Sequence, residues 1–190
     1  ERFALLVSLH GAGDTDATYM NMWKGHGEKK RWIILAPKSR GPSWTPYCMV
    51  RIGQLVQELK AKYPVDAGKL YIHGYSNGGN TALLLASVNP GLFAAAACIH
   101  GFPSKAIAGR PEGQALKGTR VFACAGGKDP CFPLERVKET CTALEGIGVN
   151  VKLHERPEAA HSYPFDLQDQ IIAFFNQAEA GEKKAQEAKK

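Results

Sequence analysis

The sequence predicts an α/β fold, in which helices cover both faces of one mostly parallel sheet to form a three-layer α/β/α sandwich. Short apolar runs typical of strands alternate with helical patterns along the chain, the order that parallel sheets require. The 190 residues are 44% hydrophobic, enough for one domain with a sizeable core. In addition, the polar residues capable of chemistry follow strand ends, where such sheets form their sites.

The predicted strands are short apolar runs bounded by glycine, proline or charged residues. The second run is ended by Pro37, and the third leads into Gly74. Runs that are apolar throughout, rather than alternating, indicate strands buried on both faces of a sheet. In chain order, the strands are expected at residues 3–9, 32–36, 69–72, 93–100, 120–125 and 149–154.

The predicted helices fill the intervals between these strands and follow the last one. The clearest carries Ile52, Val56 and Leu59 on one face, and another begins at Pro133, a residue favoured in the first turn. The connection ending at Gly118 is irregular and has no long helical lid, which predicts an open, shallow site. In chain order, the helices are expected at residues 15–24, 49–63, 78–88, 133–145 and 163–178.

Composition and charge argue against nucleic-acid-binding, membrane-spanning and zinc-binding proteins. The formal net charge of +6 is spread over the chain without an aromatic-interleaved basic stripe, so no nucleic-acid partner is predicted. No apolar run is long enough for a membrane span. Five cysteines without a C-x-x-C pair argue against a zinc site and favour reduced thiols, as in a cytoplasmic protein. The expected organisation is one domain at residues 1–180 and a polar, charged tail at 181–190.

A nucleophile elbow is predicted at Ser76. The motif Gly74-Tyr75-Ser76-Asn77-Gly78 stands between an apolar strand and a helical stretch, which is the context that gives G-x-S-x-G its meaning. The turn is so tight that its neighbours can hardly carry side chains, and the two glycines meet that requirement. We therefore expect the Ser76 hydroxyl to be exposed at the end of the third strand.

A serine hydroxyl needs a base to take its proton, and the base needs a third group to orient it. The order expected on this architecture is serine, acid, histidine, and the chain supplies Asp129 after the fifth strand and His161 after the sixth. His73 and His100 also fall at strand ends, a position from which they can line the site, but they precede the acid and so break that order. His154 lies too close to its own strand to reach across.

The oxyanion of the acyl-transfer intermediate needs preorganised N–H donors. One donor is expected to be the backbone amide of Asn77, directly after the nucleophile. The other is expected in the glycine-rich loop after the first strand, at the amide of Ala12.

With these motifs in place, the chain resembles the α/β-hydrolases. It is most similar to the phospholipase/carboxylesterase group that includes acyl-protein thioesterases, and to predicted esterases of the polyhydroxybutyrate depolymerase and feruloyl esterase kind. The resemblance implies a Ser76–His161–Asp129 catalytic triad, no cofactor and no metal, with His10, Trp44 and Tyr75 lining the substrate site. The motifs that carry it are LHGAGDT, PSW, GYSNGG, GGKDPCFP and AHSYP, in the family's order along nearly the whole chain.

The resemblance also predicts an open sheet edge. The chain begins at what resembles the family's third strand, and the strand at 32–36 would then lie at the edge of the sheet. An apolar edge strand is a template for pairing. We therefore expect a homodimer partner or an upstream segment to cover residues 32–36.

The predicted function is hydrolysis of carboxylic esters or thioesters through an acyl-serine, on a small-molecule or polymer-attached ester. One alternative is a serine peptidase of the prolyl-oligopeptidase type, which shares the elbow and the terminal histidine. The other is a binding module that keeps the fold without catalysis.

Overall fold

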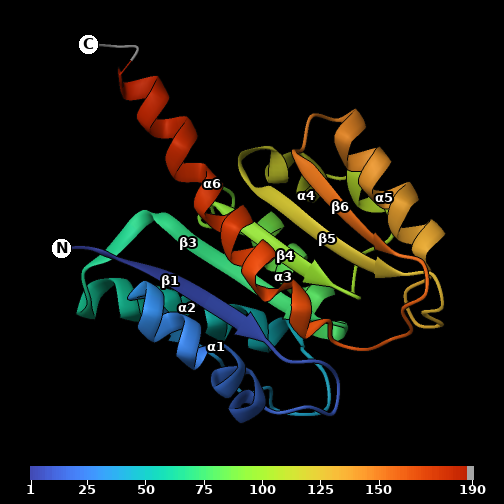
Figure 1. Ribbon diagram of the computed structural model, residues 1–190, viewed down its shortest axis with the longest axis horizontal. Helices are drawn as coiled ribbons and strands as arrows, with labels where there is room; N and C mark the ends of the chain where they lie inside the picture. The colour runs from blue at the N-terminus through green and yellow to red at the C-terminus, as the bar shows by residue number, and fades with distance from the viewer. Residues whose placement is uncertain (188–190) are drawn as a thin grey trace.

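The computed structural model contains one six-stranded sheet in which all neighbouring strands are parallel, in the order β2-β1-β3-β4-β5-β6 (Figure 1). It describes residues 1–187, with side chains as far as residue 177. The predicted fold class is therefore confirmed. The strands are β1 (Phe3–Leu9), β2 (Ile33–Leu35), β3 (Val65–Tyr75), β4 (Ala95–Ile99), β5 (Arg120–Gly126) and β6 (Val151–Arg156).

Helices cover both faces of the sheet. Buried side chains of α2, α3 and α5 join the core on one face, and those of α1 and α6 join the core on the other. In Figure 1 the red helix α6 crosses its face of the sheet. The α-helices are α1 (Asp16–Lys30), α2 (Pro46–Lys62), α3 (Asn77–Val88), α4 (Pro111–Ala115), α5 (Leu134–Gly146) and α6 (Gln168–Glu187); the 3-10 helices are η1 (Lys105–Gly109), η2 (Leu116–Gly118) and η3 (Phe165–Leu167).

The sequence directs this packing through the period-2 alternation of strand side chains. In β1, Leu5 and Val7 contribute to the core beneath α2 and α3, whereas Leu6 contributes to the core beneath α1 and α6. All five residues of β4 are buried, as expected of a central strand covered on both faces. The sheet is thus a rigid platform whose strand ends hold the loops that follow.

Three elements differ most in length from the sequence predictions. Helix α1 continues past residue 24 to Lys30, because Tyr19, Trp23 and Gly27 bury one side of it although its overall hydrophobic pattern is weak. Strand β3 begins at Val65, four residues earlier than predicted, since the pairing with β1 extends to Phe3 and Val65 past a register shift.

Helix α6 runs across the predicted boundary at residue 180 as far as Glu187. The residues near its end are mostly good helix formers, so a single glycine does not stop it. The predicted division between a domain at 1–180 and a tail at 181–190 stays a prediction, and residues 188–190 lie outside the described part of the chain.

The five cysteines are free in the structure, as the sequence favours. No helix among the described residues is long and apolar enough to cross a membrane.

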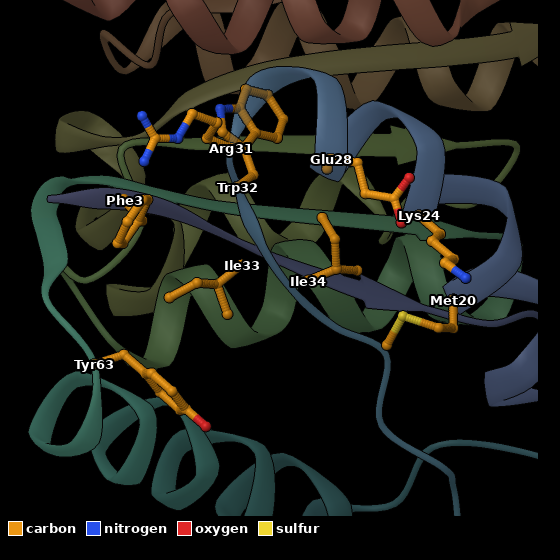
Figure 2. A pocket seen from close by; sticks show the side chains of 10 residues that line it. Phe3, Met20, Lys24, Glu28, Arg31, Trp32, Ile33, Ile34 and Tyr63 are labelled. Atoms are coloured by element: carbon orange, nitrogen blue, oxygen red, sulfur yellow. The ribbon is translucent and has the colours of Figure 1, made fainter. Parts of the chain in front are cut away.

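Strand β2 stands at the edge of the sheet, as predicted for the run at 32–36. It has three residues, all only half-buried. A cavity of about 500 Å³ lies against it. Figure 2 shows apolar side chains of this edge between α1 and Tyr63, the residue that follows α2. The lining residues are Phe3, Met20, Lys24, Gly27, Glu28, Arg31, Trp32, Ile33, Ile34 and Tyr63.

Candidate active site

Ser76 occupies a sharp turn between β3 and α3. Its backbone has φ 55 and ψ −124, a conformation that a non-glycine residue adopts only when its surroundings impose it. Backbone packs against the turn closely. A Cβ atom at Gly74 would overlap the carbonyl oxygen of Gly78, and one at Gly101 would overlap the carbonyl oxygen of Ser76 itself. The glycines let three segments meet at the serine and hold it in this geometry.

The structure brings Ser76, His161 and Asp129 into one hydrogen-bonded chain. Nε2 of His161 lies 2.8 Å from the Ser76 hydroxyl, and Nδ1 of His161 lies 2.8 Å from Oδ2 of Asp129. An ionised carboxylate can only accept hydrogen bonds, so Nδ1 of His161 carries a proton. In the neutral imidazole the lone pair of Nε2 then faces the serine hydroxyl, the arrangement in which an imidazole acts as a general base.

Asp129 lies in the loop after β5 with its side chain fully buried. Its Oδ1 accepts the backbone amides of Cys131 and Phe132 at 2.8 and 2.9 Å. Burial by itself would raise the pKa of the carboxyl. Hydrogen bonds from His161, the Phe132 amide, His100 and the Cys131 amide outweigh burial, and they hold the pKa of Asp129 below its usual value. Asp129 is thus a fixed negative charge.

The loop after β1 lies directly over the serine. A Cβ atom at Gly11 would approach the ring of Tyr75 to 3.0 Å and Cβ of Ser76 to 3.6 Å. Ala12 follows in this loop, and among the described residues its amide has no backbone acceptor. Asn77 begins α3, where the first amides of a helix point outward. The two predicted donor residues therefore sit on backbone that borders Ser76.

Trp44 links these two segments. Its indole N–H donates to the His10 carbonyl at 2.8 Å, and its backbone amide donates to Oδ1 of Asn77 at 3.0 Å. The sequence suggests a lining role for this residue, and the structure adds a bracing contact between the loop and the start of α3.

The other two predicted lining residues differ in exposure. His10 is 2% exposed, with Nδ1 bonded to the Gly11 carbonyl and Nε2 accepting the Ser39 amide. Tyr75 is half-buried, and its ring stacks on that of His161 with centroids 5.2 Å apart. The pKa of Tyr75 rises to about 12, chiefly through burial and then through the Asp129 charge. Of the two, only Tyr75 is partly exposed, and it lies beside His161.

Two residues near the site were not assigned to it by sequence reasoning. Phe132 stacks on His161 from another side, at 6.0 Å between centroids. His100 donates through Nδ1 to Oδ2 of Asp129 at 2.8 Å and is fully buried. The signal for His100 in the sequence was its place at a strand end. The structure adds that this strand, β4, pairs with β5, after which Asp129 stands.

His73 and His154 are kept from Ser76 by their own environments. His73 bonds to the Ser8 hydroxyl and to the Tyr163 hydroxyl, and burial lowers its pKa to about 3. His154 lies on β6, where its ring stacks on Phe122.

Only one cluster among the described residues has three potential metal ligands close together, namely His100, Asp129 and His161. Their facing atoms are already joined by hydrogen bonds at 2.8 Å. Those hydrogen bonds account for the cluster without a cation.

Comparison with known proteins agrees with this architecture. Residues 44–190 match the dienelactone hydrolase family. Poly(3-hydroxyalkanoate) depolymerase C of Paucimonas lemoignei is 27% identical over 136 residues, which cover 63% of this chain and 31% of that protein. The chain thus spans about a third of the length of that relative.

Solved structures show the same fold. SOBER1 of Arabidopsis thaliana superposes with a TM-score of 0.77 at 17% identity, covering 92% of this chain and 98% of that one. A phospholipase/carboxylesterase of Dyadobacter fermentans gives a TM-score of 0.70 at 22% identity, covering 94% and 90%. The predicted resemblance to α/β-hydrolases is confirmed. The chain belongs to the dienelactone hydrolase family, which agrees with the enzyme class, a hydrolase, that the sequence predicts.

Proposed function

We propose that this chain hydrolyses carboxylic esters through an acyl-serine intermediate on Ser76. The observation that carries the proposal is the continuous hydrogen-bonded chain from the Ser76 hydroxyl through His161 to Asp129, built on a strained turn. A hydroxyl in this setting becomes a nucleophile when Nε2 of His161 takes its proton. Asp129 keeps the imidazole in the required tautomer and stabilises the imidazolium that forms.

The acylation step places negative charge on the former carbonyl oxygen of the ester. The amides of Ala12 and Asn77 are the proposed donors to that oxygen, since both border Ser76 and no backbone carbonyl of residues 1–187 accepts the Ala12 amide. Loss of one such donor typically lowers kcat by about 10² to 10³. His161 then gives its proton to the leaving alcohol, and the same imidazole activates the water that releases the acid.

The substrate proposed is a small-molecule or polymer-attached ester. The relative from Paucimonas lemoignei is a poly(3-hydroxyalkanoate) depolymerase, which supports an ester carried by a large molecule. The connection between β4 and β5 contains only short helical turns, η1, α4 and η2, and forms no long lid that would exclude such a substrate.

A series of p-nitrophenyl esters of graded acyl length tests the proposal. Wild-type protein should turn over the short esters, and the Ser76→Ala variant should lose that turnover while keeping its fold by circular dichroism. Retained turnover in Ser76→Ala would remove the serine from the mechanism. A fluorogenic dipeptide in parallel separates the esterase from the peptidase alternative, and inactivity on every ester and peptide would favour a binding module.

The same proposal includes a cover for the β2 edge, supplied by a second copy of this chain or by polypeptide outside this sequence. Unpaired backbone groups of an edge strand invite pairing, and the apolar cavity beside β2 offers surface to bury. Sedimentation over a range of concentrations tests it. Self-association that Ile33→Lys weakens would favour a second copy, whereas a chain that stays monomeric and soluble throughout with this edge bare would contradict the need for a cover.

A further inference from the structure

We propose that His100 is a positioning residue of this site, which holds Asp129 in place by donating a second imidazole N–H to the oxygen that also orients His161. The inference rests on the proposed function, because it assigns His100 a part in the action of the Ser76–His161–Asp129 chain. The two imidazoles approach the same atom, Oδ2 of Asp129, each through Nδ1 at 2.8 Å.

The protonation state of His100 follows from its partners. The Asp129 carboxylate accepts only, so Nδ1 of His100 must carry a proton. Among the described residues Nε2 of His100 has no hydrogen-bond partner although it is buried. A proton there would be buried without an acceptor, so the neutral ring with Nδ1–H is the state that fits. Burial lowers the pKa of His100, which favours the same neutral form.

The surrounding groups are consistent with a neutral, donating ring. Asp129 raises the pKa of His100, whereas the nearby His161 and Arg156 lower it. The ring of Tyr75 lies 6.3 Å from that of His100. The ring packs against Gly126, where an added Cβ atom would lie only 2.8 Å from Cε1 of His100.

His100 completes the coordination of the carboxylate. Two oxygens of a carboxylate offer about four acceptor positions. Two are filled by backbone amides on Oδ1, one by His161 and one by His100. With His100 in place the carboxylate cannot rotate away from His161 without losing a buried donor.

The backbone gives matched variants for the test. His100 has φ 47, in the left-handed region that asparagine and glycine tolerate best. In His100→Asn the side-chain N–H₂ replaces Nδ1–H at the same distance along the side chain. In His100→Gly the donor is lost without new backbone strain, and the vacated space accepts added imidazole. The two variants therefore differ mainly in the hydrogen bond to Asp129.

The first measurement is the pH profile of kcat and KM. The concentration of active sites, to which kcat is normalised, is determined by titration with a fluorophosphonate. His100→Gly should lower kcat by about 10- to 100-fold, the value of a hydrogen bond to a charged group, with KM nearly unchanged. The acid limb of its profile should move to lower pH, because a carboxylate that is no longer held in place stabilises the protonated base less. His100→Asn should keep the wild-type limb, and imidazole should restore part of the activity of His100→Gly.

Two results would overturn the inference. One is a His100→Gly variant with wild-type kcat per active site and an unmoved acid limb, as expected if His100 only fills space. The other is an Asn variant as impaired as the Gly variant. The proposed function is tested separately by comparing wild-type and Ser76→Ala proteins in the same assay. Equal turnover by these two proteins would contradict the proposed function.

A second measurement does not depend on activity or on a substitution at His100. Proton NMR of the wild-type protein should show two low-field imidazole N–H signals, one from each ring bonded to Asp129, and both should persist in Ser76→Ala. A single such signal in both proteins would contradict the second donor, whatever the enzyme proves to hydrolyse.

Discussion

The Gly78→Ala substitution probes how the site is assembled, because Gly78 lies where α3 touches the loop after β1. A Cβ atom at this position would be 2.5 Å from the His10 carbonyl oxygen, 2.8 Å from the Leu9 carbonyl carbon and closer still to the Leu9 oxygen. All three are backbone atoms, which cannot turn aside as a flexible side chain can. Ordinary contact begins near 3.4 Å, so the two segments must separate by about 1 Å.

That separation has two consequences of calculable size. The loop carries Ala12, the proposed oxyanion donor, and a displacement of about 1 Å in a catalytic group can cost about 10²-fold in rate. The steric conflict in a closely packed region should lower the free energy of unfolding by about 1 to 3 kcal/mol. We expect kcat to fall much more than KM changes, because the donor acts on charge that develops in the transition state.

The assay combines urea denaturation with kinetics on a p-nitrophenyl ester. Gly25→Ala is the matched control, since Gly25 is an exposed residue of α1 with nothing within 4 Å of the added atom. It should raise stability by about 0.5 to 1 kcal/mol and leave kcat unchanged. A Gly78→Ala protein with wild-type kcat and stability would refute the reasoning that glycine is needed for this close approach.

Three further predictions concern single side chains. Asp129→Asn should lower kcat by on the order of 10⁴, because an amide lets His161 adopt the wrong tautomer, and steady-state kinetics at constant active-site concentration measures it. Trp44→Phe removes the N–H donated to the His10 carbonyl, and it should lower kcat by about 3- to 10-fold through a looser loop, the size of one neutral hydrogen bond. His73 is buried and its pKa is about 3 in the folded protein, against 6.5 when unfolded. Its contribution to stability is full above pH 6.5 and is lost as pH falls toward 3, about 2 kcal/mol by pH 5. Urea denaturation at pH 7.5 and 5 should show a smaller loss in His73→Gln than in wild type; equal losses would contradict the assignment.

The sequence predicts the fold and most of the hydrogen-bonded chain because those features have local signatures. The elbow at Ser76 needs glycines at fixed offsets, and the loops that hold Asp129 and His161 each follow a recognisable strand. The ends of α1 and β3 were less predictable. Burial of Gly27, beyond the predicted end, lengthens the helix, and pairing with β1 lengthens the strand, and neither extension has a strong local pattern in the sequence.

His100 illustrates what the sequence cannot provide. Its contact with Asp129 joins residues 29 positions apart and depends on two adjacent strands ending side by side. Chain order set His100 aside as a candidate base, and its place at a strand end indicated no more than a position lining the site. The shared carboxylate is visible only when both imidazoles are placed in three dimensions.

Mass spectrometry of the intact protein after reaction with a fluorophosphonate tests the central claim most directly, that Ser76 is a nucleophile activated by His161. We expect one adduct per chain, located on Ser76 by peptide mapping, no adduct in Ser76→Ala, and much slower labelling in His161→Gln. Labelling at another residue, or an unchanged rate in His161→Gln, would contradict the account.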